Sequence, residues 1–555
     1  MPLDTPVRIV RELASRGYNA EREAVTLLTN APDPDRAIER TVDYAPEDTL
    51  SITTEHARAA LDSLDGSDTP ARSRPGSESS PTPDSSTQSS ADVTTSTTDT
   101  SASIGDHPSP TSDSTKTDTG EKNSQGGGSP VEMKGVESTS ATPGSDEPPG
   151  PRSATTPSVK TDNDVTGNST GTGTYDDFVS VFRDRYERLS GSLRSRVNHR
   201  PASAVAAMPG GSEAALVGMV SDLRSTTNGH RLIELEDTSG TFPCLVTKDD
   251  DLADLVDELL MDEVIAIEGQ LADDAGILFA DSLHFPDVPR TYEPSTADRH
   301  VQAALVSDIH VGSQEFLEDA WHRFADWLHT DEARAVEYLL VGGDMVEGVG
   351  VYPDQDEELD IVDVYDQYER FSQLLKEVPG DIEIVMIPGN HDAVRLAEPQ
   401  PAFDDDLRDI MSAHDARFTG NPSYVTLEGV TFLMYHGVSL DEVIAEIPGA
   451  SYEQPQKAMN HLLKKRHVAP QYGGSHIRIA PEKRDYLVME EVPDVFHAGH
   501  VHKLGYGRYH NVTTINSGCW QAQTGFQESV NLDPDSGFAP IVDLDTLDVT
   551  IRKFT

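Results

Sequence analysis

The stretch VQAALVSDIH (residues 301–310) decides the fold, because an apolar run of strand length ends abruptly in Asp308 and His310. Four later stretches repeat this arrangement of an apolar run followed by polar residues. They are VEYLLVGGD (336–344), DIEIVMIPGNHD (381–392), VTFLMYHG (430–437) and VPDVFHAGHVH (492–502). Short apolar runs bounded by turn residues and charges predict buried strands. With helical patterns between them, they predict a layered α/β or α+β domain, with helices covering sheets, over residues 300–555.

The residues at these five strand ends are of types that bind metal ions. Side chains two residues apart on extended backbone point the same way, so Asp308 with His310, and His500 with His502, can each address one ion. Glycines beside them allow the backbone to turn sharply next to an ion. Oxygen and nitrogen ligands without sulfur fit Mn²⁺, Fe or Zn²⁺ at a hydrolytic centre better than a structural zinc site. One histidine at a strand end is usually structural, but five such ends in one domain argue against that interpretation.

Together these motifs resemble those of the calcineurin-like metallophosphoesterase superfamily. The family fold is a β-sandwich flanked by helices that holds two divalent metal ions, for which we expect Mn²⁺, with Fe or Zn²⁺ as alternatives. The resemblance implies Asp308, His310 and His502 as ligands of the first ion, Asn390, His436 and His500 as ligands of the second, and Asp344 as the bridge. Two neighbouring cations repel each other, which a bridging carboxylate offsets.

The same resemblance implies catalytic roles for two further residues. His391 corresponds to the histidine that protonates or stabilises the leaving oxygen, and it holds no metal in this assignment. Glu347 follows Asp344 by three residues and stands at the position of the family's orienting carboxylate, where many members carry Asp. Asp392 is expected either to orient His391 or to cap the turn, and we favour the cap.

The composition restricts the class of protein. The 555 residues include 43 Lys and Arg against 96 Asp and Glu, which gives a formal net charge of −53. Such an excess of acid is typical of halophilic proteins, because at 1 M salt a Debye length of about 3 Å screens the repulsion. Two cysteines exclude a disulfide framework. The sequence has neither a signal peptide nor an apolar run of about 18 residues, so it predicts a cytoplasmic protein that does not enter a membrane.

Four further parts precede the phosphoesterase-like domain. They are a small helical docking domain (1–65), a disordered linker (66–174), a helical connector (175–209) and a β-barrel that resembles the OB fold (210–290). In the first part, we expect helices from Val7, from a cap at Asn19 and from a cap at Thr53. The linker contains no aromatic residue and is rich in Ser, Thr, Asp, Gly and Pro, so it cannot bury enough apolar area to fold. A small sandwich is the alternative to the barrel.

A second resemblance is more specific. KKRHVAPQYGG (464–474) and APEKRDYLVMEEVPDVFHAGHVHKLGYG (480–507), together with the domain order, are similar to the small subunit of the archaeal family D DNA polymerase. This resemblance implies a 3′–5′ proofreading exonuclease, a large polymerizing subunit as partner, single-stranded 3′ ends of DNA as substrate and the sliding clamp as a further partner. The alternatives are a non-catalytic scaffold subunit and a phosphatase that acts on small or protein phosphoesters.

A basic window, residues 457–484, reverses the sign of the chain's charge. It contains one acid, Glu482, and seven basic residues, which are Lys457, Lys464, Lys465, Arg466, Arg478, Lys483 and Arg484. A basic patch with aromatic and glycine residues beside a phosphoesterase site predicts contacts with a DNA backbone or a single-stranded end. Docking on an acidic partner subunit is the alternative, and the two are compatible.

Overall fold

The computed structural model divides the chain into two compact units, Met1–Ser124 and Gln125–Thr555. The described residues are 9, 19–20, 22–29, 31, 34–44, 51–65, 134–138, 158–169, 171–351, 355–472 and 477–555. Within these ranges, no helix combines the length and the apolar character that crossing a membrane requires.

The first unit is a small helical domain. Its elements are β1 (Asn19–Ala20), α2 (Arg22–Thr29), α3 (Pro34–Tyr44), β2 (Ser51–Ile52) and α4 (Thr54–Asp65), and β1 pairs in parallel with β2. Its core is built from short apolar side chains that recur at helical spacing, among them Ala24, Leu28, Ile38 and Ala57.

The sequence predicted this unit in part. The cap at Thr53 is confirmed, because its hydroxyl accepts a hydrogen bond from the backbone N–H of His56. The cap at Asn19 is wrong, since this residue pairs within β1 and the helix begins at Arg22. The helix α3 was not predicted. The helix expected from Val7 lies, apart from residue 9, outside the described residues.

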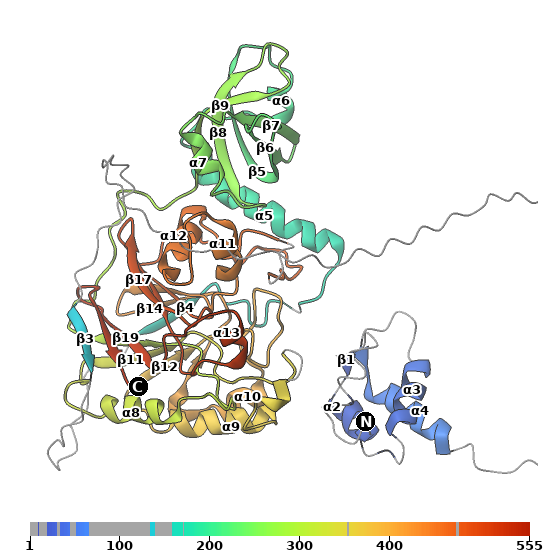
Figure 1. Cartoon of the computed structure of the whole chain (residues 1–555), viewed down its shortest axis with the longest axis vertical. Helices are drawn as coiled ribbons and strands as arrows, with labels where there is room; N and C mark the ends of the chain where they lie inside the picture. Colours follow the sequence, from blue (N-terminus) through green and yellow to red (C-terminus); the bar gives the residue numbers. More distant parts are fainter. Residues whose placement is uncertain are drawn as a thin grey trace, which may run out of the picture. The chain divides into compact units, whose positions relative to one another are not determined.

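Two mixed sheets packed face to face form the body of the second unit (Figure 1). In order across the first sheet, the strands are β13 (Arg417–Phe418), β12 (Glu383–Met386), β11 (Val336–Val341), β10 (Gln302–Val306), β19 (Phe538–Asp543), β20 (Val549–Lys553) and β3 (Lys134–Ser138). In order across the second, they are β17 (Leu504–Tyr509), β18 (Val512–Ser517), β16 (Val495–Ala498), β15 (Val430–Met434), β14 (Ser423–Leu427) and β4 (Val159–Asp162). The predicted layered domain is confirmed at this level.

The strands quoted from the sequence lie at the centre of the two sheets. β10 to β13 run parallel to one another, and so do β15, β16 and β18. Their inner faces meet in one apolar core that contains Leu305, Leu340 and Val385 from the first sheet and Phe432 and Ile515 from the second. Central parallel strands are covered on both faces, which explains why they read as continuous apolar runs.

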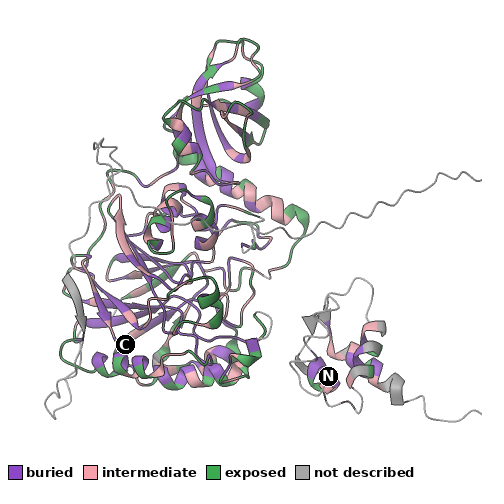
Figure 2. Cartoon of the chain, viewed as in Figure 1, coloured by how far each residue is buried: buried purple, intermediate pink, exposed green. Residues whose placement is uncertain are grey.

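Helices cover the outer faces of both sheets, so buried residues fill the interior and exposed ones lie on the outside (Figure 2). α8 (Glu318–Leu328), α9 (Val364–Leu375) and α10 (Asp405–Ile410) pack on the first sheet, and α11 (Leu440–Glu446) and α12 (Pro455–Lys465) pack on the second. The helical patterns expected between the strands are confirmed. α9 begins after Asp363, whose carboxylate accepts hydrogen bonds from the next backbone N–H groups.

A closed five-stranded barrel precedes the sandwich in the chain. Its strands, in order around the barrel, are β5 (Glu213–Ser225), β6 (Arg231–Asp237), β7 (Gly240–Val246), β9 (Leu278–His284) and β8 (Val264–Leu271). Two short helices, α6 (Ala202–Val205) and α7 (Leu252–Val256), pack against its core, and α7 lies between β7 and β8 in the chain. Closure of the barrel excludes the small sandwich.

The linker predicted for residues 66–174 is wrong at its carboxyl-terminal end. β4 pairs with β14 at the edge of the second sheet, and β3 pairs with β20 in the first. Asp164 accepts a hydrogen bond from the backbone N–H of Gly420, and Thr174 caps the connector helix α5 (Tyr175–Arg194). An edge strand gains backbone hydrogen bonds without burying large side chains, so composition alone does not reveal it. Residues 66–133 and 139–157 lie outside the described residues.

Candidate metal centre

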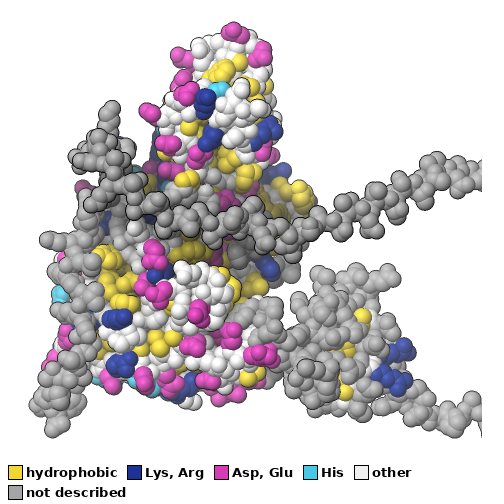
Figure 3. Space-filling model, in the orientation of Figure 1, with side chains coloured by type: hydrophobic (Ala, Val, Ile, Leu, Met, Phe, Trp, Pro, Cys, Tyr) yellow, Lys and Arg dark blue, Asp and Glu magenta, His cyan; other side chains and the backbone are white. Residues whose placement is uncertain are grey.

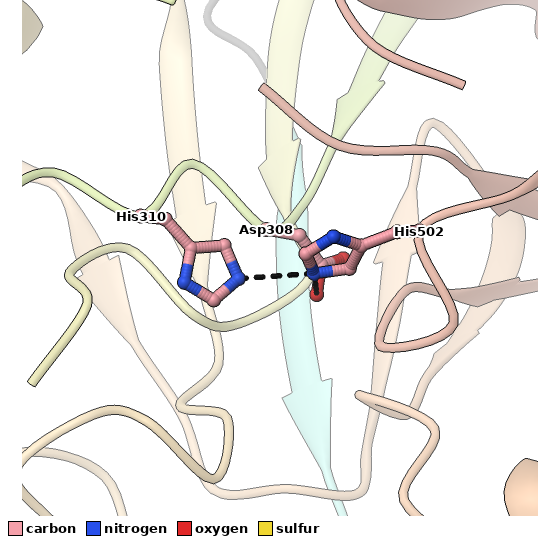
Figure 4. Close-up of side chains that lie close together, drawn as sticks. All are labelled: Asp308, His310 and His502. Carbon is pink, nitrogen blue, oxygen red and sulfur yellow. Dashed lines mark hydrogen bonds and ion pairs between the residues drawn. The ribbon is translucent and has the colours of Figure 1, made fainter. Parts of the chain in front are cut away.

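The seven predicted metal ligands lie in the loops that follow β10, β11, β12, β15 and β16. The first group of ligands is Asp308, His310 and His502, whose ligand atoms all lie within 4.8 Å of one another. The Nε2 atoms of His310 and His502 are 3.1 Å apart, and Nε2 of His502 is 3.5 Å from Oδ1 of Asp308 (Figure 4). All three residues are buried. Two ring nitrogens and one carboxylate that converge in this way can hold a single cation.

A second group of ligands adjoins the first. The ligand atoms of Asp344, His436 and His500 lie within 4.8 Å of one another. Nε2 of His436 is 3.1 Å from Oδ2 of Asp344 and 3.0 Å from Oδ1 of Asn390. The same Oδ2 of Asp344 is 3.9 Å from Nε2 of His310, which belongs to the first group. Asp344 therefore lies between the two groups, at the place expected of a bridging ligand.

The hydrogen bonds of His436 show that this site needs positive charge. Its Nδ1 is 2.9 Å from the carbonyl oxygen of Gly342, so this nitrogen donates, and Nε2 lies 3.0–3.1 Å from oxygen atoms of Asn390 and Asp344. Burial lowers the pKa of His436, but the charge of Asp344 outweighs it and raises the pKa to about 10. Burial raises the pKa of Asp344, but His436 and His391 hold it well below its usual value. The carboxylate of Asp344 is surrounded by imidazole groups, and a divalent cation there would supply positive charge, so these residues fit a cation.

The backbone of the centre is strained. Five of the ligand residues have a positive φ between 51° and 71°, and they are Asp308, His310, Asp344, His500 and His502. A non-glycine residue in this region costs roughly 1–3 kcal/mol, and such residues concentrate at functional sites. The strain turns these side chains toward the common centre, a feature that sequence spacing did not predict.

The glycines of the motifs provide space for the carboxylates. A Cβ atom on Gly389 would lie 2.2 Å from Oδ1 of Asp344, and one on Gly499 would lie 2.3 Å from Oδ2 of Asp308. Gly343 and Gly437 have a positive φ, of 98° and 123°, and a Cβ atom on Gly343 would also lie 2.6 Å from Nδ1 of His436. The expectation that glycine serves the sharp turn holds for Gly343 and Gly437, whereas Gly389 and Gly499 are required by close packing.

The structure brings His391 and Glu347 together, but in a different relation from the expected one. Nδ1 of His391 is 2.8 Å from the backbone carbonyl oxygen of Glu347 and 3.7 Å from its carboxylate. The other carboxylate oxygen is 2.8 Å from Nδ1 of His310, although the angle is not that of a hydrogen bond. Burial raises the pKa of Glu347, but His310 outweighs it and lowers the pKa to about 2. The backbone carbonyl thus orients His391, and the carboxylate supports the ligand His310.

Asp392 caps the turn, as favoured from the sequence. Its Oδ2 accepts hydrogen bonds from the backbone N–H groups of Gly389 at 2.8 Å and Asp344 at 2.9 Å. Its Oδ1 accepts one from the hydroxyl of Tyr368 at 3.0 Å. These bonds join the loop after β11 to the loop after β12 and fix the position of Asp344.

Three residues that support the ligands were missed from the sequence. Oδ2 of Asp441 is 3.0 Å from Nε2 of His500, and Nε2 of Gln527 is 2.8 Å from Nδ1 of His502. Gln521 donates a hydrogen bond to the carboxylate of Glu347. Such partners fix the orientation of metal ligands. They come from α11, α13 (Gly525–Ser529) and the loop after β18, and no spacing in the sequence relates them to the motifs.

A cavity of about 940 Å³ opens over the centre. Its lining includes His310, Asp344, His391, His500 and His502. Residues of α11 and α13 contribute its walls. Four of the seven candidate ligands and the candidate proton donor therefore border one space that can admit a small phosphoester or the end of a chain.

The basic window does not form one surface. Lys465 is fully buried with Nζ 2.9 Å from Oε2 of Glu263 in the barrel, so its predicted contact with DNA is wrong. Nζ of Lys464 is 2.5 Å from Oε2 of Glu258 and lies 4.2 Å from the centre of the Phe285 ring. A sequence window cannot show such pairing, because these partners lie far away in the chain.

The remaining basic residues differ in exposure. Arg466 donates hydrogen bonds to the carbonyl groups of Met489 and Glu490, so it also serves the fold rather than DNA. Lys457, Arg478, Lys483 and Arg484 are exposed. Residues 473–476 of the window lie outside the described residues. On the face in Figure 3, acidic side chains are scattered over the barrel and the sandwich, in keeping with the acidic composition.

Comparison with known proteins defines the class first. Residues 303–504 match the family of the B subunits of DNA polymerases alpha and epsilon. The match begins in β10 and ends in β17, so it contains all seven candidate ligands.

Relatives over the whole chain define the family more narrowly. The chain is 60% identical over 557 residues to the DNA polymerase II small subunit of Halobacterium salinarum, which covers 100% of both proteins. It is 44% identical over 388 residues to that of Archaeoglobus fulgidus, covering 68% of this chain and 77% of that protein. It is 38% identical over 394 residues to that of Methanocaldococcus jannaschii, covering 69% of this chain and 66% of that protein. The chain belongs to the family of archaeal DNA polymerase II small subunits, which confirms the resemblance found in the sequence.

Proposed function

We propose that this chain is the nuclease-bearing small subunit of a two-subunit archaeal DNA polymerase, and that it removes nucleotides from the 3′ ends of DNA by hydrolysing phosphodiesters. One observation carries the proposal: Asp344 lies between two groups of ligand side chains on the floor of an open cavity, with His391 beside them. A scaffold subunit requires no such arrangement, and a strained, buried cluster of carboxylates and imidazoles is costly to maintain without function.

The residues divide the chemistry between them. Two divalent cations, for which we expect Mn²⁺, supply Lewis acidity and acidify water when they are bound. The two ligand groups hold them, and Asp344 offsets their repulsion. Because Nδ1 of His391 donates to the carbonyl of Glu347, Nε2 is left to carry the proton that passes to the leaving oxygen. Gln527 and Asp441 keep the ligands His502 and His500 in place.

The rest of the chain supports a role in replication. The names of its relatives describe a small subunit, which requires a larger partner, and we propose a large polymerizing subunit as that partner and the sliding clamp as a further contact. The closed five-stranded barrel supports an OB-type domain, a class that commonly binds single strands. The sandwich with its two ligand groups supports a metallophosphoesterase domain.

Labelled DNA tests the proposal. The full chain is purified at high salt, alone and with its large subunit, and given Mn²⁺ and single strands labelled at the 3′ or the 5′ end. We expect the 3′ label to be released first as a mononucleotide, the 5′ label to yield a descending ladder, and chelation of the metal to stop both. A chain that binds no divalent cation and degrades neither strand, with or without the large subunit, would be a scaffold.

A further inference from the structure

Exposed apolar side chains are concentrated at the cavity. Nine large apolar side chains are exposed in the described part of the chain, and three of them line this one cavity. They are Tyr452, Phe526 and Val530, with exposed fractions of 37%, 67% and 57%. None of them contributes to the metal ligands. Exposed apolar side chains that are grouped at one cavity mark a candidate surface for binding a ligand.

The backbone that carries Phe526 is fixed beside the candidate metal ligands. Gln527 bonds to His502 at 2.8 Å and closes a reciprocal capping box with Thr524 at the start of α13. The other end of the segment is tied by Gln523, whose side chain donates to the carbonyl of Leu532 at 2.7 Å. Neighbouring Cα atoms are about 3.8 Å apart, so the backbone that presents Phe526 adjoins a residue that touches a ligand.

The cavity offers a phosphate backbone little positive charge from long basic side chains. Among the described residues that line it, there is neither Lys nor Arg, whereas Asp441, Glu442 and Glu453 are present. For a nucleic acid chain that enters, cations at the ligand groups and contacts with its bases are therefore the main sources of binding energy. Bases stack on aromatic side chains without regard to sequence, because every base has a π face.

We propose that Phe526, flanked by Val530, is the stacking platform for the unpaired base at the 3′ end while the adjoining phosphodiester lies at the ligand groups. This inference rests on the proposed nuclease function and says which substrate the site prefers, an unpaired 3′ end. A base in a duplex is stacked and paired and cannot reach the platform, whereas a frayed or mismatched end can. Phe526 thus sets the preference for single-stranded ends.

The test measures how fast the full-length protein, supplied with Mn²⁺, hydrolyses two oligonucleotide substrates. They are identical except that the nucleotide at the 3′ end carries a base in one and is abasic in the other. Phe526→Ala is expected to lower kcat/KM for the base-bearing end about tenfold to a hundredfold, mainly through KM, and to leave the abasic end nearly unchanged. Phe526→Trp should restore the preference. Phe279→Ala is the matched control, because this Phe is 44% exposed on β9 and outside the cavity lining, and it should keep the difference between the two ends.

Three outcomes would overturn the platform. They are a wild-type chain that does not distinguish the two ends, an equal loss on both ends in Phe526→Ala, and a variant that loses the large subunit on gel filtration but keeps the discrimination. The last result would make this rim a docking surface. Fluorescence anisotropy of the same oligonucleotides measures binding without hydrolysis. A wild-type chain that binds the base-bearing end more tightly through Phe526, yet degrades nothing, would keep the platform and overturn the nuclease.

Discussion

The candidate metal centre and the basic window teach different lessons about predicting function from a sequence. Both were selected by residue type and local spacing. The seven candidate ligands converge on one small volume, whereas the seven basic residues separate into three that serve the fold and four that are exposed. The ligand motifs succeed because each is attached to the end of a buried strand, and parallel strands bring their ends together. A run of charged residues in the sequence does not show which of their side chains will be buried.

The helix α12 shows how this difference arises. Lys457 lies near its start and is exposed, whereas Lys464 and Lys465 lie in its last turn against the barrel. Their acidic partners, Glu258 and Glu263, precede them by about 200 residues in the chain. In a protein of net charge −53, a buried lysine is more readily explained by an acid elsewhere in the fold than by an external polyanion.

The largest effect is expected at the bridge between the ligand groups. Asp344→Asn should lower the metal content below that of His310→Ala, because one neutralised side chain leaves two cations without the carboxylate that offsets their repulsion. The loss of nuclease activity should be at least the roughly 10²–10⁴-fold that a single proton-transfer group supplies. Elemental analysis and circular dichroism check metal content and folding. A variant that keeps two ions and most of its activity would remove the bridge from the mechanism.

His391→Ala is expected to separate chemistry from metal binding. Its Nδ1 bonds to a backbone carbonyl, and the two ligand groups are complete without it, so the metal content should be nearly unchanged. Hydrolysis should fall by roughly 10²–10⁴-fold, as expected for loss of a general acid. Elemental analysis beside the activity assay decides the point. Ligand atoms of His391, His310 and Glu347 also lie within 4.8 Å of one another, and loss of one ion would make His391 a ligand.

Residue types and strand ends were enough to predict the layered domain, the barrel and the convergence of the candidate ligands. They could not supply the supporting residues Asp441 and Gln527, because α11 and α13 reach the centre only through the tertiary fold. Nor could they show that the carbonyl of Glu347 orients His391, since a backbone atom leaves no trace in residue identity. The edge strand β4 escaped for a related reason: its partners are backbone groups, and its side chains are largely exposed.

The buried half of the basic window should act on stability. Burial raises the pKa of Glu263 and lowers that of Lys465, so desolvation opposes both charges of the pair. Lys465→Met leaves Glu263 buried without its partner and should cost about 3–5 kcal/mol of unfolding free energy. The double change with Glu263→Leu should recover most of this loss, because well-packed apolar residues often replace a buried pair. Lys457→Met is the exposed control and should change stability by less than about 0.5 kcal/mol. Denaturant unfolding measures all three.

The smallest effect, and the sharpest test of the comparison, concerns the exposed half of the window. Reversal of Lys457, Arg478, Lys483 and Arg484 to Glu should lower hydrolysis of long single strands several-fold at the lowest salt at which the chain stays folded. Cleavage of a small chromogenic phosphodiester should hardly change, since that substrate reaches no farther than the ligand groups. Lys376→Glu, an exposed charge at the end of α9 on the sandwich, is the control.

Salt dependence separates guidance of DNA from a structural role. Each lost phosphate contact on a single strand should reduce the slope of log affinity against log salt by about 0.7. A shallower slope in the variant, with metal content and unfolding unchanged, would show that the exposed residues track the backbone. If the slope stayed at its wild-type value, neither half of the window would contact DNA, and the exposed residues would serve the fold or the contact with the large subunit. The cavity, which has neither Lys nor Arg in its described lining, would then depend on the large subunit for its long-range hold on DNA.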